Sequence, residues 1–228
     1  PFIDHHWIAE WRLPDSAAVP QRAIPSPHAH LLVSPGQTAL IGVVRGVEER
    51  VLRGQGQAFG IRLRVGGLRP FLGQPVASLT GRTVSPALLT GCEAAVLESR
   101  ILTKDGHQTM IEAAEMLLRP SLPQVDPNVD LVCSVVAEIR RAGGRARAET
   151  LAKGFGIGLR AMQRRFHDYV GVSPKWVIQR YRLQDAAYLL SSGTGAHLAQ
   201  LADELGYFDQ AHLTRDFRRI FGVSPALY

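Results

Sequence analysis

The sequence contains very little cysteine and no long apolar segment. Cys92 and Cys133 are its only two cysteines, too few for a disulfide framework or for a zinc site made of thiolates alone. No apolar run approaches the roughly 18 residues that a transmembrane helix needs, and the first residues show no basic segment followed by an apolar one. We therefore expect a cytoplasmic protein without membrane contact, in which both thiols are reduced and have no chemical role.

Charge is unevenly distributed along the chain. Residues 129–228 carry 14 Lys and Arg against 9 Asp and Glu, whereas residues 1–128 carry 12 against 11. The C-terminal part therefore holds +5 of the formal net charge of +6. A basic surface attracts a polyanion and makes its binding salt-dependent, but charge alone indicates no sequence preference.

A helix, a tight turn and a second helix are predicted between Ala196 and Tyr228. Gly206 can supply the left-handed residue that ends the first helix, and Asp209 can cap the second. Apolar side chains repeat at helical spacing in both segments, at Leu198, Leu201, Ala202, Leu205, Leu213, Phe217 and Ile220. The pattern fits a helix-turn-helix unit whose second helix enters a major groove, and it also fits an ordinary amphipathic helical hairpin.

The same unit occurs earlier in the chain. Leu151-Ala152 and Gly156 precede Leu201-Ala202 and Gly206 by 50 positions. After one inserted residue the offset becomes 51, and it pairs Met162 with Leu213, Arg164 with Arg215, Phe166 with Phe217, and the two Gly-Val-Ser-Pro segments with each other. A period near 50 with matching core, turn and Arg positions favours two helix-turn-helix units over the single-hairpin alternative.

Residues 128–228 resemble the DNA-binding domain of the AraC/XylS family of transcription regulators. The most specific segments are GLRAMQRRF at 158–166, the two GVSP elements, and LADELGYFDQAHLTRDFRRIFGVSP from Leu201. The resemblance implies two such units joined by a long helix, which Ser173-Pro174 would open. It implies a sequence-specific transcription regulator that is not an enzyme, with double-stranded DNA as its partner, a nucleoid-associated location and RNA polymerase as a further candidate partner.

The resemblance also implies which side chains contact DNA. Base readout would use Arg160, Gln163 and Arg164 in the first unit, and Gln210, Ala211, His212, Thr214 and Arg215 in the second. Arg fits guanine and Gln fits adenine in the major groove. Phosphate contacts are expected at Lys175, Arg218 and Arg219.

Two positions depart from the family pattern. Gly158-Leu159 stands where the family often has Ser-Pro, so the first recognition helix lacks a capping hydroxyl. Ala211 replaces what is often a polar reader and leaves only apolar contact, such as with a thymine methyl.

Residues 1–83 are predicted to form a small β-barrel or sandwich. Short alternating runs are separated by Pro, Gly and Ser, at Ile3–Leu13, His30–Val33, Leu40–Val44, Glu49–Leu52 and Phe59–Arg64. Residues 58–82 resemble the sensor segment of a subgroup of the same regulators, which implies a degenerate cupin-like fold. We expect this domain to regulate by binding a small-molecule effector of unknown identity or a second subunit. Overall we expect an α+β protein.

Residues 84–118 are predicted to form a helical pair. Ser85-Pro86 opens a first helix that continues through Cys92 to Ile101, and a second helix covers His107–Leu118. The pair either covers the barrel or forms a homodimer contact. The Pro-rich segment 119–128 is the expected linker, and residues 129–228 are the expected DNA-binding domain, with a first helix over Asp130–Arg141.

Two enzymatic alternatives compete with regulation. His28-Ala-His30 would suit a metal-dependent cupin enzyme, but Ser34-Pro35 occupies the place of the expected carboxylate, so we expect no metal, no other cofactor and no catalytic residue. A methyl-accepting DNA repair protein would use Cys92 or Cys133, which both fall in predicted helices without partners that lower a thiol pKa. A nonspecific architectural DNA binder is a third alternative.

Overall fold

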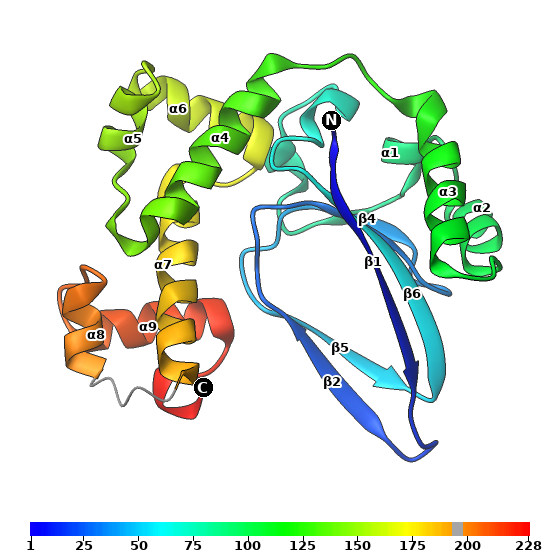
Figure 1. The fold of residues 1–228 in the computed structure, drawn as a ribbon, viewed down its shortest axis with the longest axis horizontal. Helices are drawn as coiled ribbons and strands as arrows, with labels where there is room; N and C mark the ends of the chain where they lie inside the picture. Colours follow the sequence, from blue (N-terminus) through cyan, green and yellow to red (C-terminus); the bar gives the residue numbers. More distant parts are fainter. Residues whose placement is uncertain (193–197) are drawn as a thin grey trace.

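The computed structural model describes residues 1–192 and 198–228 and has an α+β fold (Figure 1). The N-terminal part consists of antiparallel sheets with a cluster of helices, and the C-terminal part is helical. The predicted fold class is therefore confirmed. Ala196 and His197, with which the predicted second unit begins, lie outside the described residues.

The N-terminal part contains a five-stranded sheet in the order β1-β6-β3-β4-β7 and a separate two-stranded sheet, β2-β5. All of these pairings are antiparallel. The strands are β1 (Ile3–Arg12), β2 (Ala18–Ala23), β3 (His30–Val33), β4 (Ala39–Ile41), β5 (Glu48–Arg53), β6 (Gln55–Leu63) and β7 (Thr83–Val84). Strands β2 and β7 were not predicted, because β2 contains a proline and few apolar residues, and β7 is only two residues long.

Strand β6 organises the N-terminal core. Its Phe59, Ile61 and Leu63 are buried, while Arg62 between them is partly exposed, as the predicted alternation requires. Leu97, from the helical segment that follows, belongs to the same hydrophobic core. The helical segment therefore covers the sheet within a single chain.

The helical segment differs from its prediction in one place. Instead of one helix from Ser85 to Ile101, the chain forms α1 (Ala87–Thr90), α2 (Ala94–Leu97) and a π-helical turn η3 (Glu98–Leu102). Gly91 ends α1 with a left-handed φ of 69°, and the Cys92 amide donates to Thr90 Oγ1. The predicted continuous helix through Cys92 is wrong, because the apolar stripe continues across a glycine cap. The second helix, α3 (His107–Leu118), lies where it was predicted.

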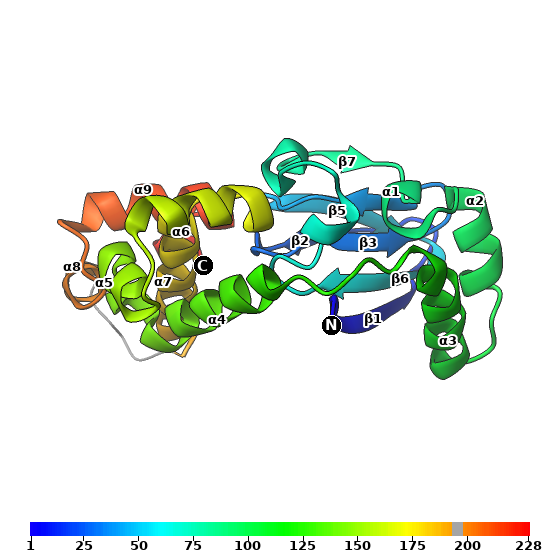
Figure 2. The same cartoon turned by 90° about the horizontal axis from the view of Figure 1, so that it is seen from above.

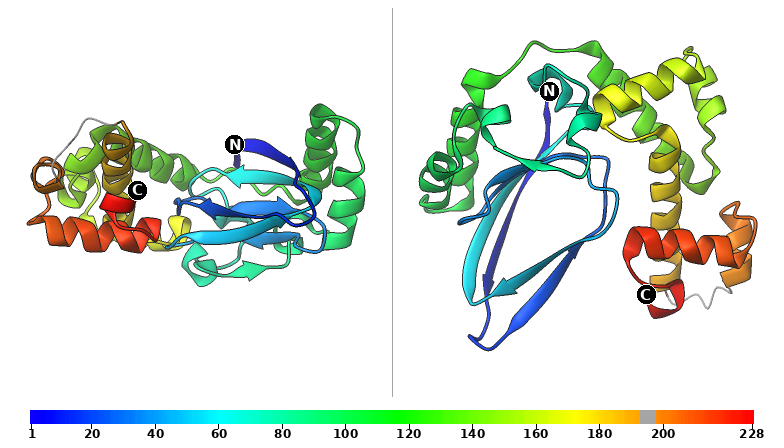
Figure 3. Two further views of the ribbon diagram at one scale, coloured as in Figure 1. Left: turned by 90° about the horizontal axis from the view of Figure 1, so that it is seen from below. Right: turned by 180° about the vertical axis from the view of Figure 1, so that it is seen from behind.

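The C-terminal part is built around a long central helix, α7 (Pro174–Ser191). One hydrophobic core packs its first half against α4 (Pro127–Ala142), α5 (Ala148–Gly154) and α6 (Leu159–Arg165). A second core packs its other half against α8 (Leu198–Glu204) and α9 (Gln210–Phe221). Figure 3 (right) shows the two helix pairs at opposite ends of α7. The predicted pair of units joined by a long helix is confirmed.

Short helical turns complete the chain and connect the elements. They are η1 (Arg69–Phe71), η2 (Val76–Leu79), η4 (Arg119–Ser121), η5 (Gly143–Arg145), η6 (Phe166–Val170) and η7 (Pro225–Leu227). After η4, extended residues lead from α3 to α4 across the top of the molecule in Figure 1. The extended path fits the Pro-rich composition of this segment.

The first unit packs against the sheet domain. Val43 and Val65 of the sheet domain belong to the same hydrophobic core as α4 and α6. Thr80 Oγ1 donates to the carbonyl oxygen of Gly171 over 2.6 Å, and Arg64 forms a salt bridge of 2.9 Å with Asp130. These contacts fix the first unit to the sheet domain.

Candidate nucleic-acid interface

The turns of the two helix-turn-helix units begin with the same backbone geometry. Gly156 and Gly206 follow the first helix of each unit with φ of 65° and 71°. The next amide in each turn, Ile157 or Tyr207, donates to the carbonyl oxygen of Ala152 or Ala202, over 3.0 and 2.8 Å respectively. The repeat detected in the sequence is therefore a repeat of backbone geometry.

The second helices of the two units, α6 and α9, lie on the same side of α7 (Figure 2), and the polar face of each is exposed. Their apolar faces are inward: Phe166, which directly follows α6, and Phe217 of α9 are fully buried. Because both faces are carried by one rigid helix, the spacing between them is set by α7. Such an arrangement can present two helices to successive major grooves, which lie about 34 Å apart along DNA.

The two units begin their second helices differently. Gly158 precedes α6 without a side-chain cap, as predicted, whereas Asp209 caps α9 by accepting a hydrogen bond of 2.6 Å from the His212 amide. Ser173 caps α7 by accepting from the Trp176 amide over 3.2 Å, and this places Lys175 in the first turn of that helix. The predicted cap at Ser173 is confirmed.

The residues predicted to contact DNA lie on these outward surfaces. Thr214 is half-buried, and the other predicted base readers are exposed, namely Arg160, Gln163, Arg164, Gln210, Ala211, His212 and Arg215. The predicted phosphate contacts, Lys175, Arg218 and Arg219, are exposed as well. Within residues 1–192 and 198–228, Arg164 and Arg215 have no salt-bridge partner, so both guanidinium groups are available to a ligand.

A groove of about 620 Å³ separates the two units. It is lined by residues of both recognition helices and of α7, including Gln163, Lys175, His212 and Arg219. Residues that were predicted to read bases and residues that were predicted to contact phosphates therefore border one continuous depression. A DNA backbone that crosses from one major groove to the next could lie here.

Asp216, which was not predicted as a site residue, organises the second unit's side of the groove. Its side chain is buried and accepts from Gln179, lies 3.0 Å from Arg219 and lies 3.4 Å from the His212 imidazole. The carboxylate therefore lies close to both His212 and Arg219. Its position four residues after His212 and three before Arg219 is the only sequence signal for this role.

The sheet domain contains an open cavity of about 320 Å³ that His28 and His30 both line. One His28 ring nitrogen lies 2.9 Å from the Leu63 carbonyl oxygen, and the other lies 2.7 Å from the Arg62 guanidinium. Burial lowers the pKa of both imidazoles to about 4. Both histidines are therefore neutral at pH 7, and both ring nitrogens of His28 are occupied by protein groups.

The two cysteines lie in different surroundings. Cys92 lies between α1 and α2, outside the helix in which it was predicted, and Cys133 lies in α4 as predicted. The Cys133 thiol is 3.1 Å from the Val65 carbonyl oxygen, and burial raises the pKa of this thiol. A raised pKa opposes the formation of the nucleophilic thiolate.

Two kinds of site were not found within the described ranges 1–192 and 198–228, a metal-binding cluster and a membrane-spanning helix. No group of three or more His, Cys, Asp or Glu side chains is positioned there to hold a metal ion. Every helix in those ranges is too short or too polar to cross a lipid bilayer.

Comparison with known protein families divides the chain into two matched regions. Residues 151–228 match the family described as a helix-turn-helix domain, and residues 1–85 match a domain of unknown function (DUF6597). Together with the regulators described below, the first match confirms the resemblance to the AraC/XylS regulators. The cupin-like character of the N-terminal domain stays a prediction.

Curated relatives match mainly through the C-terminal region. The transcriptional activator RhaS of Escherichia fergusonii is 32% identical over 34% of this chain and 27% of its own length. The transcriptional regulator ExsA of Pseudomonas aeruginosa is 24% identical over 67% of this chain and 58% of its own length. The chain spans 21 to 27% of the length of the first curated relatives that it matches.

Comparison with solved structures finds two further matches. A transcriptional regulator from Chromobacterium violaceum with an AraC-type DNA-binding domain matches 41% of this chain and 83% of its own, at 22% identity and a TM-score of 0.38. ToxT from Vibrio cholerae matches 98% of this chain and 92% of its own, at 9% identity and a TM-score of 0.43.

Proposed function

We propose that this chain, with its AraC/XylS-type helix-turn-helix domain, is a sequence-specific DNA-binding transcription regulator. The observation that carries the proposal is the pair of exposed polar faces on α6 and α9, two helices that lie on one side of α7 (Figure 2). Each face has an arginine at the matched position, Arg164 or Arg215, that has no salt-bridge partner among the described residues. An unpaired guanidinium in a major groove can donate two hydrogen bonds to guanine O6 and N7. Two such faces on one rigid helix support recognition of two half-sites in successive major grooves.

The remaining predicted contacts divide by chemistry. The proposed readers are Arg160, Gln163 and Arg164 of α6, and Gln210, Ala211, His212, Thr214 and Arg215 of α9. Lys175, Arg218 and Arg219 would neutralise phosphates, which supplies affinity without sequence preference. Asp216 would act indirectly, because it orients His212 and Arg219 toward the groove.

The sheet domain would regulate DNA binding through a small molecule in the cavity that His28 and His30 line. Pro25 also lines this cavity, and its carbonyl oxygen accepts a hydrogen bond of 2.6 Å from the buried guanidinium of Arg180 on α7. A ligand that moves Pro25 would therefore move the helix that carries both units. Such a ligand can change the free energy of DNA binding by no more than the difference between its own binding free energies for the two domain arrangements, typically about 1 to 3 kcal/mol.

The enzymatic alternatives receive less support from the side chains. A metal-dependent cupin enzyme would need a ring nitrogen of His28 as a ligand, but Arg62 and the Leu63 carbonyl oxygen each lie within hydrogen-bond distance of one of its two ring nitrogens. The raised pKa of Cys133 opposes a methyl-accepting role for that thiol. RNA polymerase and a second copy of the chain are candidate partners through the family resemblance alone.

Selection of bound sequences from random DNA by the full chain tests the proposal. We expect a two-part site whose halves are centred about one helical turn apart, with an affinity that falls steeply as salt rises. Equal binding to selected and bulk DNA at fixed salt would instead identify a nonspecific architectural binder and contradict the proposal.

A further inference from the structure

The turns of the two helix-turn-helix units differ in length by one residue. Ile157 and Tyr207 are equivalent, because their amides bind equivalent carbonyl oxygens in α5 and α8. Gly158 and Asp209 are also equivalent, because each directly precedes its recognition helix. Phe208 stands between Tyr207 and Asp209 and has no counterpart in the first unit.

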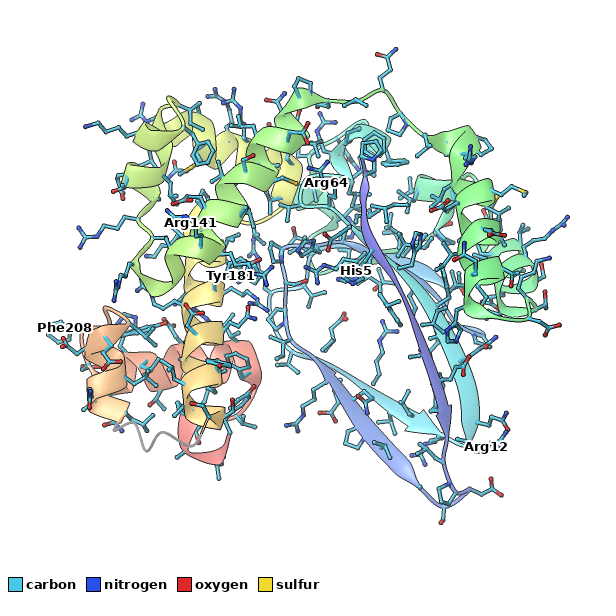
Figure 4. The ribbon with its side chains drawn as sticks, viewed as in Figure 1. His5, Arg12, Arg64, Arg141, Tyr181 and Phe208 are labelled. Atoms are coloured by element: carbon cyan, nitrogen blue, oxygen red, sulfur yellow. The ribbon has the colours of Figure 1, made fainter. Side chains whose placement is uncertain are left out.

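Phe208 contributes little to the packing of the protein. Its side chain is 95% exposed, and Figure 4 shows it projecting outward from the turn before α9. An apolar residue at this position often packs on the fourth residue of the helix, which is Leu213 here. Leu213 is fully buried beneath other residues, so Phe208 does not form this staple. The fold leaves the ring in water, where a large apolar surface is costly.

The position of Phe208 places its ring beside the proposed reading surface. Residues at the N-terminal end of a recognition helix contact base edges, and Phe208 lies two residues before Gln210 at this end of α9. Ala211, in the same turn, offers only a methyl group. Phe208 and Ala211 are thus two exposed apolar residues at the end of α9 where the proposed readers Gln210 and His212 also lie.

We propose that Phe208 is a further specificity-determining residue, whose ring packs against the C5-methyl group of a thymine in the major groove that α9 enters. Thymine carries the one apolar group that a base pair presents in that groove, and Phe is among the side chains that contact it. The inference rests on the proposed function. It makes the second unit prefer a thymine at a position where the first unit, which lacks this residue, has no such preference.

The test uses the full chain and the DNA site selected by the unmodified protein. At each thymine of the second half-site, deoxyuridine replaces thymidine and removes only the methyl group. We expect one replacement to weaken binding about fourfold, which is the loss for one buried methyl-sized group, and Phe208→Ala to weaken binding to the thymine site by at least that factor. The same replacement should leave the affinity of Phe208→Ala unchanged, and Phe208→Leu should retain part of the thymine preference.

A matched variant and a stability measurement distinguish a methyl contact from a backbone contact, a protein partner or a folding defect. Tyr188→Ala removes another exposed aromatic side chain, 72% exposed on α7, and should bind both sites as the unmodified protein does. Melting temperatures of the Phe208 variants should equal that of the parent. A uniform loss on all DNA, or a loss of promoter activity with unchanged DNA affinity, would overturn the inference and indicate a backbone contact or a protein partner. Failure of the unmodified chain to select any sequence would contradict the proposed function itself.

Discussion

The two helix-turn-helix units are alike in backbone but differ in their surroundings. Gly171, which follows the first unit, is closely packed: a Cβ atom there would lie 2.7 Å from Thr80 Oγ1 of the sheet domain. At the equivalent Gly222 the nearest atom would be 3.7 Å away, on Val47. A duplicated sequence has therefore acquired one copy that is tightly docked on the sheet domain and one that is loosely placed beside it. The difference suits the first unit to anchoring and the second to repositioning through α7.

The largest expected effect concerns the two buried phenylalanines. Phe166→Ala and Phe217→Ala should each lower the free energy of unfolding by about 3 to 5 kcal/mol, because each leaves a cavity beneath a recognition helix. Phe166 lies in the core that includes the sheet-domain residue Val65, so its loss should also weaken domain docking. Urea unfolding measures both effects. An unchanged unfolding midpoint for either variant would contradict its assignment to the core.

Low pH should destabilise the sheet domain, to which the first unit is docked. The folded protein lowers the pKa of His28 to about 4, whereas an unfolded imidazole protonates near 6.5. The stability contribution is therefore intact above pH 6.5 and is lost as pH falls toward 4, by at most about 3 kcal/mol. Melting temperatures at pH 7 and pH 5 test this, and His28→Asn should reduce the pH dependence.

The matched arginines allow the base specificity of the two units to be compared directly. Arg164→Ala and Arg215→Ala should each cost about 1 to 3 kcal/mol on the preferred site and relax specificity at base pairs roughly one turn apart. Binding assays on single-base variants of the selected site measure the change. A uniform weakening on every sequence would show that these arginines contact phosphates.

The matched glycines, Gly171 and Gly222, allow the contribution of the contact between the first unit and the sheet domain to be measured separately. Gly171→Ala and Gly222→Ala each place a Cβ on a residue with positive φ, 84° and 76° respectively, which costs about 1 to 2 kcal/mol. Gly171→Ala should cost more, because only there does the new atom meet Thr80. Thermal unfolding of the two variants gives the difference. Equal losses would mean that the two units are docked with equal tightness.

The smallest expected effect concerns the helix caps. Asp209→Ala should destabilise α9 by about 1 kcal/mol, since it removes the acceptor for the His212 amide. Gly158→Ser should stabilise α6 by some tenths of a kcal/mol, because the φ of −70° suits serine and no atom lies within 4 Å of the new Cβ. Thermal unfolding should show shifts of opposite sign, and shifts of the same sign would contradict the capping difference.

Features with a local cause could be predicted from the sequence. The caps at Ser173 and Asp209 and the turns at Gly156 and Gly206 depend on neighbouring residues, so each left a signal in the sequence. The end of α1 at Gly91 has a local cause too, but it was missed because the apolar stripe continued past the glycine.

Features that join distant parts of the chain were not predicted. Arg180 and Pro25 are 155 positions apart, and no periodicity relates them. Asp216 has a polar side chain on an amphipathic helix, so its burial depends on the packing of α9 against α7. The inserted Phe208 was visible only as a change of offset in the repeat, and its exposure required the folded structure.

The hydrogen bond between Arg180 and Pro25 joins α7 to the sheet domain at a point away from the middle of the helix, so a tilt about this point would move the two helix ends by different distances. With 18 residues the helix is about 27 Å long, and Arg180 lies close to its first unit. The 11 residues that follow Arg180 in α7 span about 16 Å, so a tilt of about 5° at Arg180 moves the far end of the helix by about 1.4 Å. The end nearer the first unit moves less than that. Small displacements at the cavity that His28 and His30 line would therefore move the two units unequally, and the proposed second half-site would respond more strongly than the first.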